Sequence, residues 1–226
     1  MSLEESVKKM GEMAAGFVKN DDIVGLGSGS AVAAFVNALG NRIKNEDLTV
    51  TGIPTSMQIE LIAEKNEIIL ESPSKITEID IVVDGADQID QNYCMIKGGG
   101  GAHFREKIMI ESSKKRIIVA DESKYVNKIT RSVPIEVTLF SKNSVEKSLK
   151  KMNGNPEVRT LNKGYPFFTQ NGNLVLDTEF GTIDDPINLE NELYRVPGII
   201  ANGIFSMKIH HFLKAKNDGI VEQIDL

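Results

Sequence analysis

The sequence has one cysteine, three histidines and no tryptophan. Cys94 cannot form an internal disulfide, and so few cysteines and histidines exclude a zinc site built from these residues. Long apolar runs are also missing: the run 79–83 is far shorter than the ~20 residues of a membrane-spanning helix. The first residues show no basic segment followed by an apolar one. We therefore expect a cytoplasmic protein with no membrane partner and no metal, whose chemistry depends on carboxylates, lysines and backbone groups.

Positive charge is in short supply as well. The 226 residues include 26 lysines and arginines against 32 aspartates and glutamates, which gives a formal net charge of −6. Binding to DNA or RNA usually requires a basic surface, so a nucleic-acid partner is not expected. With 41% hydrophobic and 26% charged residues, the composition is that of a folded globular protein.

The first half of the chain alternates between strand-like and helix-like segments. Ser2 and Glu5 have the spacing of a helix capping box, and Gly40 is a candidate helix stop. Apolar spacing predicts helices at 3–19, 31–39 and about 55–65, and strands at 23–26, 49–52, 68–70, 79–83 and 116–120. Such alternation predicts an α/β fold with a mostly parallel sheet covered on both faces.

The pattern changes at about residue 127 and indicates a smaller α+β unit. We expect strands at 134–140, 157–161 and 173–177, a helix at 144–152, an apolar run at 197–205 and a helix at 206–216. A short final strand could rejoin the first sheet. The predicted division is a main domain of residues 1–127 plus 204–226, with an inserted domain of residues 128–203.

A glycine-rich loop follows the first predicted strand. The segment Gly25-Leu-Gly-Ser-Gly-Ser30 opens a helix, where free backbone N–H groups and the helix dipole favour an anion such as phosphate. It is a poor dinucleotide fingerprint, since Val32 replaces the third glycine, and it lacks the lysine of a P-loop. A plain glycine turn is the alternative interpretation.

Two aspartates follow the apolar strand 79–83. Asp84 and Asp87 would lie at the carboxyl end of that strand, where open α/β sheets bind ligands. Aspartate also caps turns and helices very often, and the sequence does not separate the two interpretations.

The most unusual segment is Lys97-Gly-Gly-Gly-Gly101. Four consecutive glycines are entropically costly to order, so they suggest close approach of the backbone to a ligand. A lysine that can neutralise an oxyanion and a carboxylate base at Glu106, about two turns beyond, suit proton abstraction next to a carbonyl. A flexible hairpin followed by a surface glutamate is the alternative. His103 could be a base, but a structural role is favoured.

Taken together, these motifs resemble the ribose-5-phosphate isomerases of the A type. The resemblance is carried by Gly25–Ser30, Gly52-Ile-Pro-Thr-Ser56, Asp84-Gly-Ala-Asp87, Lys97–Lys107 and Asp121-Glu-Ser-Lys124. It continues more loosely through Asn171-Gly-Asn, Asp177 and Pro197-Gly198, and so covers nearly the whole chain. Such enzymes interconvert D-ribose 5-phosphate and D-ribulose 5-phosphate, need no cofactor, and have a Rossmann-like domain with an inserted α+β domain. They assemble as homodimers or homotetramers.

The resemblance implies a role for each motif residue. Glu106 would be the base, Lys97 would stabilise the enediolate, and Asp84 would hold sugar hydroxyls and help to open the ring. At Ala31 family members usually have threonine, so this chain has one hydroxyl fewer there. The implied substrate contacts are Ser28, Gly29, Ser30, Ala31, Asp84, Gly85, Ala86, Asp87, Lys97, Gly98, Gly99, Gly100 and Lys124.

Two other functions remain open at this point. Related α/β folds serve as sugar-phosphate sensors, although Glu106 and Lys97 favour catalysis. An amino-sugar-phosphate deaminase or isomerase would use similar chemistry on a six-carbon substrate.

Overall fold

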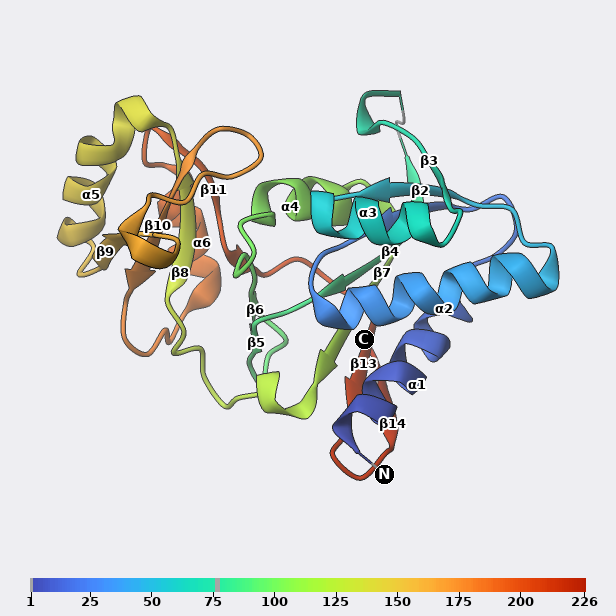
Figure 1. The fold of residues 1–226 in the computed structure, drawn as a ribbon. Coiled ribbons are helices and arrows are strands. Elements are labelled where there is room, and N and C mark those ends of the chain that lie inside the picture. The colour runs from blue at the N-terminus through green and yellow to red at the C-terminus, as the bar shows by residue number, and fades with distance from the viewer. Residues whose placement is uncertain (1, 76–77) are drawn as a thin grey trace. The chain divides into compact units, whose positions relative to one another are not determined.

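A computed structural model describes residues 2–75 and 78–226, which form two compact units (Figure 1). Unit 1 comprises the described residues up to 86, together with 105–124 and 208–226. Unit 2 comprises 87–104 and 125–207. The segment 87–104 therefore groups with unit 2, whereas the sequence-based division assigned it to the main domain. The reason is strand pairing, because residues 95–96 pair with 204–205.

Unit 1 is built on one seven-stranded sheet. The strand order is β14-β13-β7-β4-β1-β2-β3, and every neighbouring pair is parallel except β13 with β14. The strands are β1 (Ile23–Leu26), β2 (Thr51–Pro54), β3 (Ile69–Leu70), β4 (Ile79–Gly85), β7 (Ser113–Asp121), β13 (His211–Ala215) and β14 (Val221–Asp225). The expected α/β class with a mostly parallel sheet is confirmed.

Helices cover both faces of this sheet. On one face α1 packs against α2 and β13, and the apolar core there includes Val24, Ile81 and Ile117. On the other face Met109 of α4 packs at Gly25, where a Cβ atom would lie 2.7 Å from its side chain. The helices are α1 (Leu3–Ala15), α2 (Ser30–Glu46), α3 (Met57–Lys65) and α4 (His103–Glu111), with short 3-10 turns η1 (Pro73–Lys75) and η2 (Glu122–Lys124).

The second helix is longer than expected. It continues through Gly40 to Glu46, so Gly40 is not a helix stop. A Cβ atom at Gly40 would lie 2.5 Å from the side chain of Asn66, just after α3. This glycine therefore allows α2 to approach the end of α3 closely.

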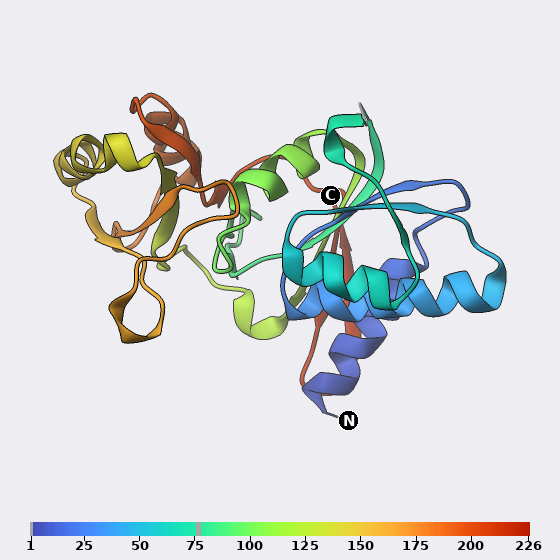
Figure 2. The same ribbon diagram turned by 45° about the horizontal axis from the view of Figure 1, so that its top comes forward.

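The expectation of a helix at 206–216 is wrong, because residues 211–215 form strand β13. This strand lies between β7 and β14, and Phe212 and Leu213 are both fully buried. A strand buried on both faces has no apolar–polar alternation, so periodicity alone does not separate it from a helix. Figure 2 shows the consequence for topology: the C-terminal strands lie beside the N-terminal helix α1.

Unit 2 is an α+β unit with two antiparallel sheets. The larger sheet has the order β11-β8-β10-β9, and the smaller has the order β12-β6-β5. Helix α6 was not expected, although Asp185 caps it and Pro186 occupies its first turn. The elements are β5 (Gln88–Ile89), β6 (Met95–Ile96), β8 (Val133–Val137), η3 (Leu139–Ser141), α5 (Lys142–Lys151), β9 (Asn155–Val158), η4 (Asn162–Gly164), β10 (Leu174–Glu179), α6 (Pro186–Tyr194), β11 (Ile199–Asn202) and β12 (Ile204–Phe205).

Candidate active site

In unit 1 the polar residues expected at the site follow the carboxyl ends of parallel strands. The glycine–serine loop follows β1, Asp84 lies near the end of β4, and Lys124 belongs to η2 after β7. Carboxyl ends of parallel strands share one edge of the sheet, which is where open α/β sheets bind ligands.

The glycine–serine loop runs directly into α2. Gly29 is the N-cap of this helix, with φ of 97°, a conformation that favours glycine. No side chain caps the helix, which leaves its first N–H groups suited to an anion. Ser28 and Ala31 are half-buried, whereas Ser30, the first residue of α2, is exposed.

Asp84 is fully buried and holds the loop in place. Its Oδ1 atom accepts hydrogen bonds from the backbone N–H of Ser28 at 3.1 Å and of Gly85 at 2.7 Å. A Cβ atom at Gly27 would lie 2.1 Å from the same oxygen, so only glycine fits there. The structure thus brings Asp84 together with the loop, and the carboxylate stabilises a turn in addition to any role toward a ligand.

Two hydroxyl groups that sequence reasoning did not assign lie next to the loop. The Ser28 hydroxyl is 2.8 Å from the Oγ1 of Thr55 and 2.9 Å from the Oγ of Ser56. Thr55 is fully buried and donates to the carbonyl of Leu26, while Ser56 caps α3. The Thr-Ser pair directly after β2 was the signal that could have found them, since hydroxyl residues after a strand commonly cap a helix.

The residue expected to be the base lies in the first turn of α4. Glu106 is only 4% exposed. The helix begins at His103, two residues after the glycine run, so Glu106 lies in its first turn rather than two turns beyond the glycines. His103 is fully buried, and its ring would lie 2.8 Å from a Cβ atom at Gly98. This packing favours the structural interpretation of His103.

The glycine run and its neighbours lie in unit 2. Gly98 has φ of 102° and Gly101 has φ of 76°, values that favour glycine. The backbone N–H of Gly99 donates to the Oδ2 of Asp87 at 2.8 Å, so the structure brings these two residues together. Gly99 and Gly100 are exposed, and a Cβ atom at Gly100 would meet nothing within 4 Å.

Lys97 is 3% exposed, and both its backbone and its side chain make contacts within unit 2. Its backbone N–H donates to the carbonyl of Gly203 at 2.9 Å. Its Nζ atom lies 5.4 Å from the centre of the Phe205 ring, within cation–π range. A nearly buried ammonium group with a fixed backbone suits the stabilisation of a negative oxygen.

The 3-10 turn that carries Lys124 is tied to the turn between β13 and β14. The backbone N–H of Asn217 donates to the carboxylate of Glu122 at 3.1 Å, and its side-chain amide donates to the same oxygen. Asp121 accepts a hydrogen bond from the backbone N–H of Ser123 at 2.9 Å. Lys124 therefore has a defined backbone position and a half-buried side chain.

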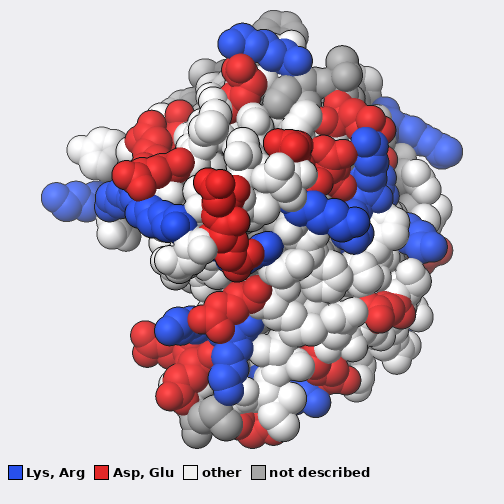
Figure 3. Space-filling view, turned by 90° about the vertical axis from the view of Figure 1, so that its right-hand side faces the viewer, with Lys and Arg blue, Asp and Glu red and all other residues white. Residues whose placement is uncertain are grey.

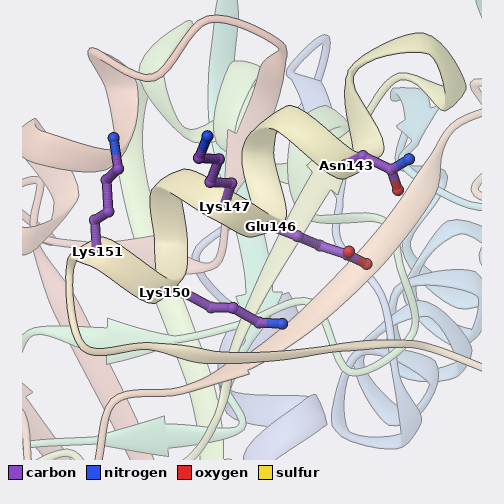
Figure 4. Close-up of a pocket in the computed structure, with 5 residues that line it drawn as sticks. All are labelled: Asn143, Glu146, Lys147, Lys150 and Lys151. Atoms are coloured by element: carbon purple, nitrogen blue, oxygen red, sulfur yellow. The ribbon is translucent and has the colours of Figure 1, made fainter.

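A depression in unit 2 has a different character (Figure 4). All five of its lining residues come from α5: Asn143, Glu146, Lys147, Lys150 and Lys151. Their side chains diverge from the helix, as Figure 4 shows, and Glu146 pairs with Lys142 at 2.8 Å. This exposed helix face offers no convergent groups for catalysis.

Three further features of the described residues concern metal binding, membrane spans and surface charge. Among residues 2–75 and 78–226 no cluster of three or more histidine, cysteine, aspartate or glutamate side chains could hold a metal ion. Within the same residues no helix is long and apolar enough to cross a membrane. On the face drawn in Figure 3, acidic and basic side chains are interspersed.

The fold and the polar sheet edge define an α/β protein of the class that binds small ligands at the carboxyl ends of parallel strands. The family model of ribose 5-phosphate isomerase A (phosphoriboisomerase A) matches residues 51–219. The chain is 41% identical over 215 residues to ribose-5-phosphate isomerase A of Methanosarcina acetivorans, which covers 95% of this chain and 92% of that protein. The chain belongs to the ribose 5-phosphate isomerase A family.

Solved structures of ribose 5-phosphate isomerases superimpose on nearly the whole chain. The ribose 5-phosphate isomerase A structure from Methanocaldococcus jannaschii superimposes with a TM-score of 0.93 at 37% identity, and each chain is covered completely. A D-ribose-5-phosphate isomerase in complex with phospho-erythronic acid gives a TM-score of 0.94 at 36% identity, again with complete coverage of both chains. The structure from Plasmodium falciparum gives 0.89 at 33% identity, covering 97% of this chain and 99% of that chain.

Proposed function

We propose that the protein interconverts D-ribose 5-phosphate and D-ribulose 5-phosphate, a reaction of the non-oxidative pentose phosphate pathway. The observation that carries the proposal is the similarity along the whole chain to solved ribose 5-phosphate isomerases. One of these is in complex with phospho-erythronic acid, a four-carbon phosphorylated acid whose planar carboxylate is similar in shape and charge to an enediolate.

In this proposal Glu106 moves the proton. Its carboxylate removes the proton from C2 of the open-chain aldose, the electron pair forms the C1–C2 double bond, and O1 becomes negative. The protonated carboxyl group then returns the proton to C1, while the hydroxyl proton of O2 passes to O1 and the carbonyl forms at C2. The near-complete burial of Glu106 supports this role, since a base shielded from water keeps the proton it has taken.

Lys97 and the glycine run would stabilise the negative oxygen of the enediolate. Lys97 supplies the positive charge, and Gly98, Gly99 and Gly100 supply backbone amides. Donors that are already in position need no rearrangement when the charge develops, which is why such groups lower the barrier. The low exposure of Lys97 strengthens its interaction with an anion.

The sugar hydroxyls would be held by the segment after β4. Asp84 and Asp87 accept hydroxyl hydrogen bonds, and the backbone of Gly85 and Ala86 completes this contact. Asp84 would also help to open the furanose ring by exchanging a proton with the ring oxygen or the C1 hydroxyl. Oδ1 of Asp84 already accepts two backbone hydrogen bonds, and these fix the direction of the carboxylate.

The phosphate would bind at the start of α2. Backbone N–H groups of Gly29, Ser30 and Ala31 and the hydroxyls of Ser28 and Ser30 are the donors, and Lys124 supplies a positive charge. The hydrogen bonds of Ser28 with Thr55 and Ser56 support this proposal, because they orient the Ser28 hydroxyl.

Neither a metal nor an organic cofactor takes part in the proposed reaction. We place the enzyme in the cytoplasm as a homodimer or homotetramer, with a sugar phosphate as its ligand rather than nucleic acid or a membrane. The test is conversion of ribose 5-phosphate by purified protein in EDTA without added nucleotide. Turnover under these conditions supports the proposal, whereas a strict need for a divalent ion would contradict it.

Two comparisons make the assay selective. Glucosamine 6-phosphate tests the amino-sugar alternative, and we expect no turnover with it. A sugar-phosphate sensor would show thermal stabilisation by ribose 5-phosphate without any ketose formation.

A further inference from the structure

One guanidinium group in unit 2 binds two consecutive carbonyls of the glycine run. Arg159, directly after β9, donates from Nη1 to the carbonyl of Gly98 at 2.8 Å and to that of Gly99 at 3.1 Å. The rest of the group pairs with Asp177 on β10, through Nε at 2.7 Å and Nη2 at 2.5 Å. The Arg159 side chain is only 15% exposed. The arginine thus bridges a carboxylate of the sheet and the backbone of the run.

The direction of these carbonyls determines the direction of the amides. In a trans peptide the C=O and the following N–H point opposite ways. With the Gly98 carbonyl on Arg159, the N–H of Gly99 points away from the arginine and donates to Asp87 at 2.8 Å. With the Gly99 carbonyl on Arg159, the N–H of Gly100 also points away from the arginine. Both amides therefore face away from the guanidinium, and one already contacts an expected sugar-binding residue.

A run of glycines needs such an anchor. Glycine peptides rotate with little steric cost, so the run alone would not keep its amides in one direction. Phe167 supplies a second restraint, because a Cβ atom at Gly101 would lie 2.5 Å from its ring. The same ring lies 5.6 Å from the Arg159 guanidinium carbon.

We propose that Arg159 is a positioning residue of the isomerase reaction. By holding the carbonyls of Gly98 and Gly99, it points the amide of Gly100 toward the oxygen that becomes negative in the enediolate and keeps the amide of Gly99 on Asp87. Asp177 holds the guanidinium group in this orientation by accepting hydrogen bonds from Nε and Nη2. Positive charge at the carbonyl side also polarises each peptide and strengthens its N–H as a donor. This inference rests on the proposed function, and it assigns to Arg159 no contact with the substrate.

The test compares Arg159→Met and Arg159→Lys with the parent protein. Loss of an oxyanion donor costs about 10²–10³ in kcat, so misdirected amides should lower kcat by about 10–100-fold in the methionine variant. KM for ribose 5-phosphate should change less than about threefold, because the charge forms only near the transition state. Arg159→Lys keeps the positive charge but cannot bind both carbonyls and Asp177 at once as the planar guanidinium does, so it should keep only part of the activity. The kcat of Asp177→Asn should lie between those of the parent protein and Arg159→Met.

Two inhibitors provide a readout that a general structural defect would not reproduce. Phospho-erythronic acid presents a carboxylate to the oxyanion donors, and its Ki should rise by about 10-fold or more in Arg159→Met. Inorganic phosphate tests only the phosphate loop, and its Ki should stay as in the parent.

Arg42→Met is the matched control. In unit 1 Arg42 likewise donates to two backbone carbonyls, those of Ala15 and Val18, and pairs with Glu46. The melting temperature of Arg42→Met should fall about as much as that of Arg159→Met. Below that temperature, Arg42→Met should keep the parental kcat.

The outcomes separate the inference from the function on which it rests. A folded Arg159→Met with parental kcat and parental Ki for phospho-erythronic acid would overturn the inference and leave the isomerase proposal intact. Equal changes in KM and in both Ki values would also overturn it, since they indicate a general defect. If Arg159→Met does not fold, the lysine and Asp177→Asn variants decide by the same measures. A parent protein without isomerase activity would contradict the proposed function itself.

Discussion

At the scale of single residues, Glu106 is the group on which turnover should depend most. Glu106→Gln keeps the size and most hydrogen bonding of the side chain but removes the base. We expect kcat to fall by about 10²–10⁴, the usual effect of general-base catalysis, with unchanged circular dichroism. Near-parental turnover in a folded variant would reassign the base, with Asp84 the next candidate.

Cys94 illustrates a side chain that the structure makes unreactive. Burial, helped by the negative charge of Asp90, raises the pKa of its thiol to about 11. Little thiolate exists at pH 8, and the thiolate is the reactive form. We expect native protein to react slowly with Ellman's reagent at pH 8 and rapidly in urea. Complete modification of native protein within seconds would contradict this.

At the scale of elements, the start of α2 determines how the substrate phosphate should bind. Gly29 is the N-cap and Ser30 the first helical residue, so an aspartate at position 30 is compatible with the helix dipole. The same carboxylate would repel a phosphate dianion. Ser30→Asp should raise KM for ribose 5-phosphate at least about tenfold, or ~1.4 kcal/mol, with nearly unchanged melting temperature.

Ser30→Asn is the control for this prediction. It has the same shape without the charge, and its KM should stay within about threefold of the parent. If Ser30→Asp left KM and inhibition by phosphorylated acids unchanged, the phosphate would bind elsewhere, with Lys124 the first alternative.

The elements that sequence reasoning predicts well are those with local signals. Strand β1 is found at its expected bounds of Ile23–Leu26, because a short apolar run is bounded by a glycine loop. Strand β13 is not found because its apolar residues show no alternation, and its place in the sheet depends on pairing with β7, about 90 residues earlier in the chain, and with β14. Arg159 could not be found at all, since its partners at Gly98 and Gly99 lie 60 or so residues away.

At the scale of the whole molecule, exposed apolar side chains suggest an interface between copies of the chain. In unit 2 Phe140 is fully exposed, with Leu139 59% and Ile187 53% exposed. Leu139 and Phe140 are adjacent in the chain, and contiguous exposed apolar surface often marks such interfaces. We expect light scattering after gel filtration to give the mass of two or four chains of 24.8 kDa. A mass of one chain across micromolar concentrations would contradict the homo-oligomer.

The joining of the two chain ends in unit 1 has a consequence for synthesis on the ribosome. The hydroxyl of Ser6 donates to the carbonyl of Lys216 at 2.5 Å, and Lys9 donates to Gly219 at 3.3 Å. Until β13 emerges from the ribosome, β7 stays an edge strand and α1 lacks part of the surface on which it packs. Unit 2, by contrast, needs nothing beyond residue 207. The part of the protein that is translated first is therefore the part that completes its folding last.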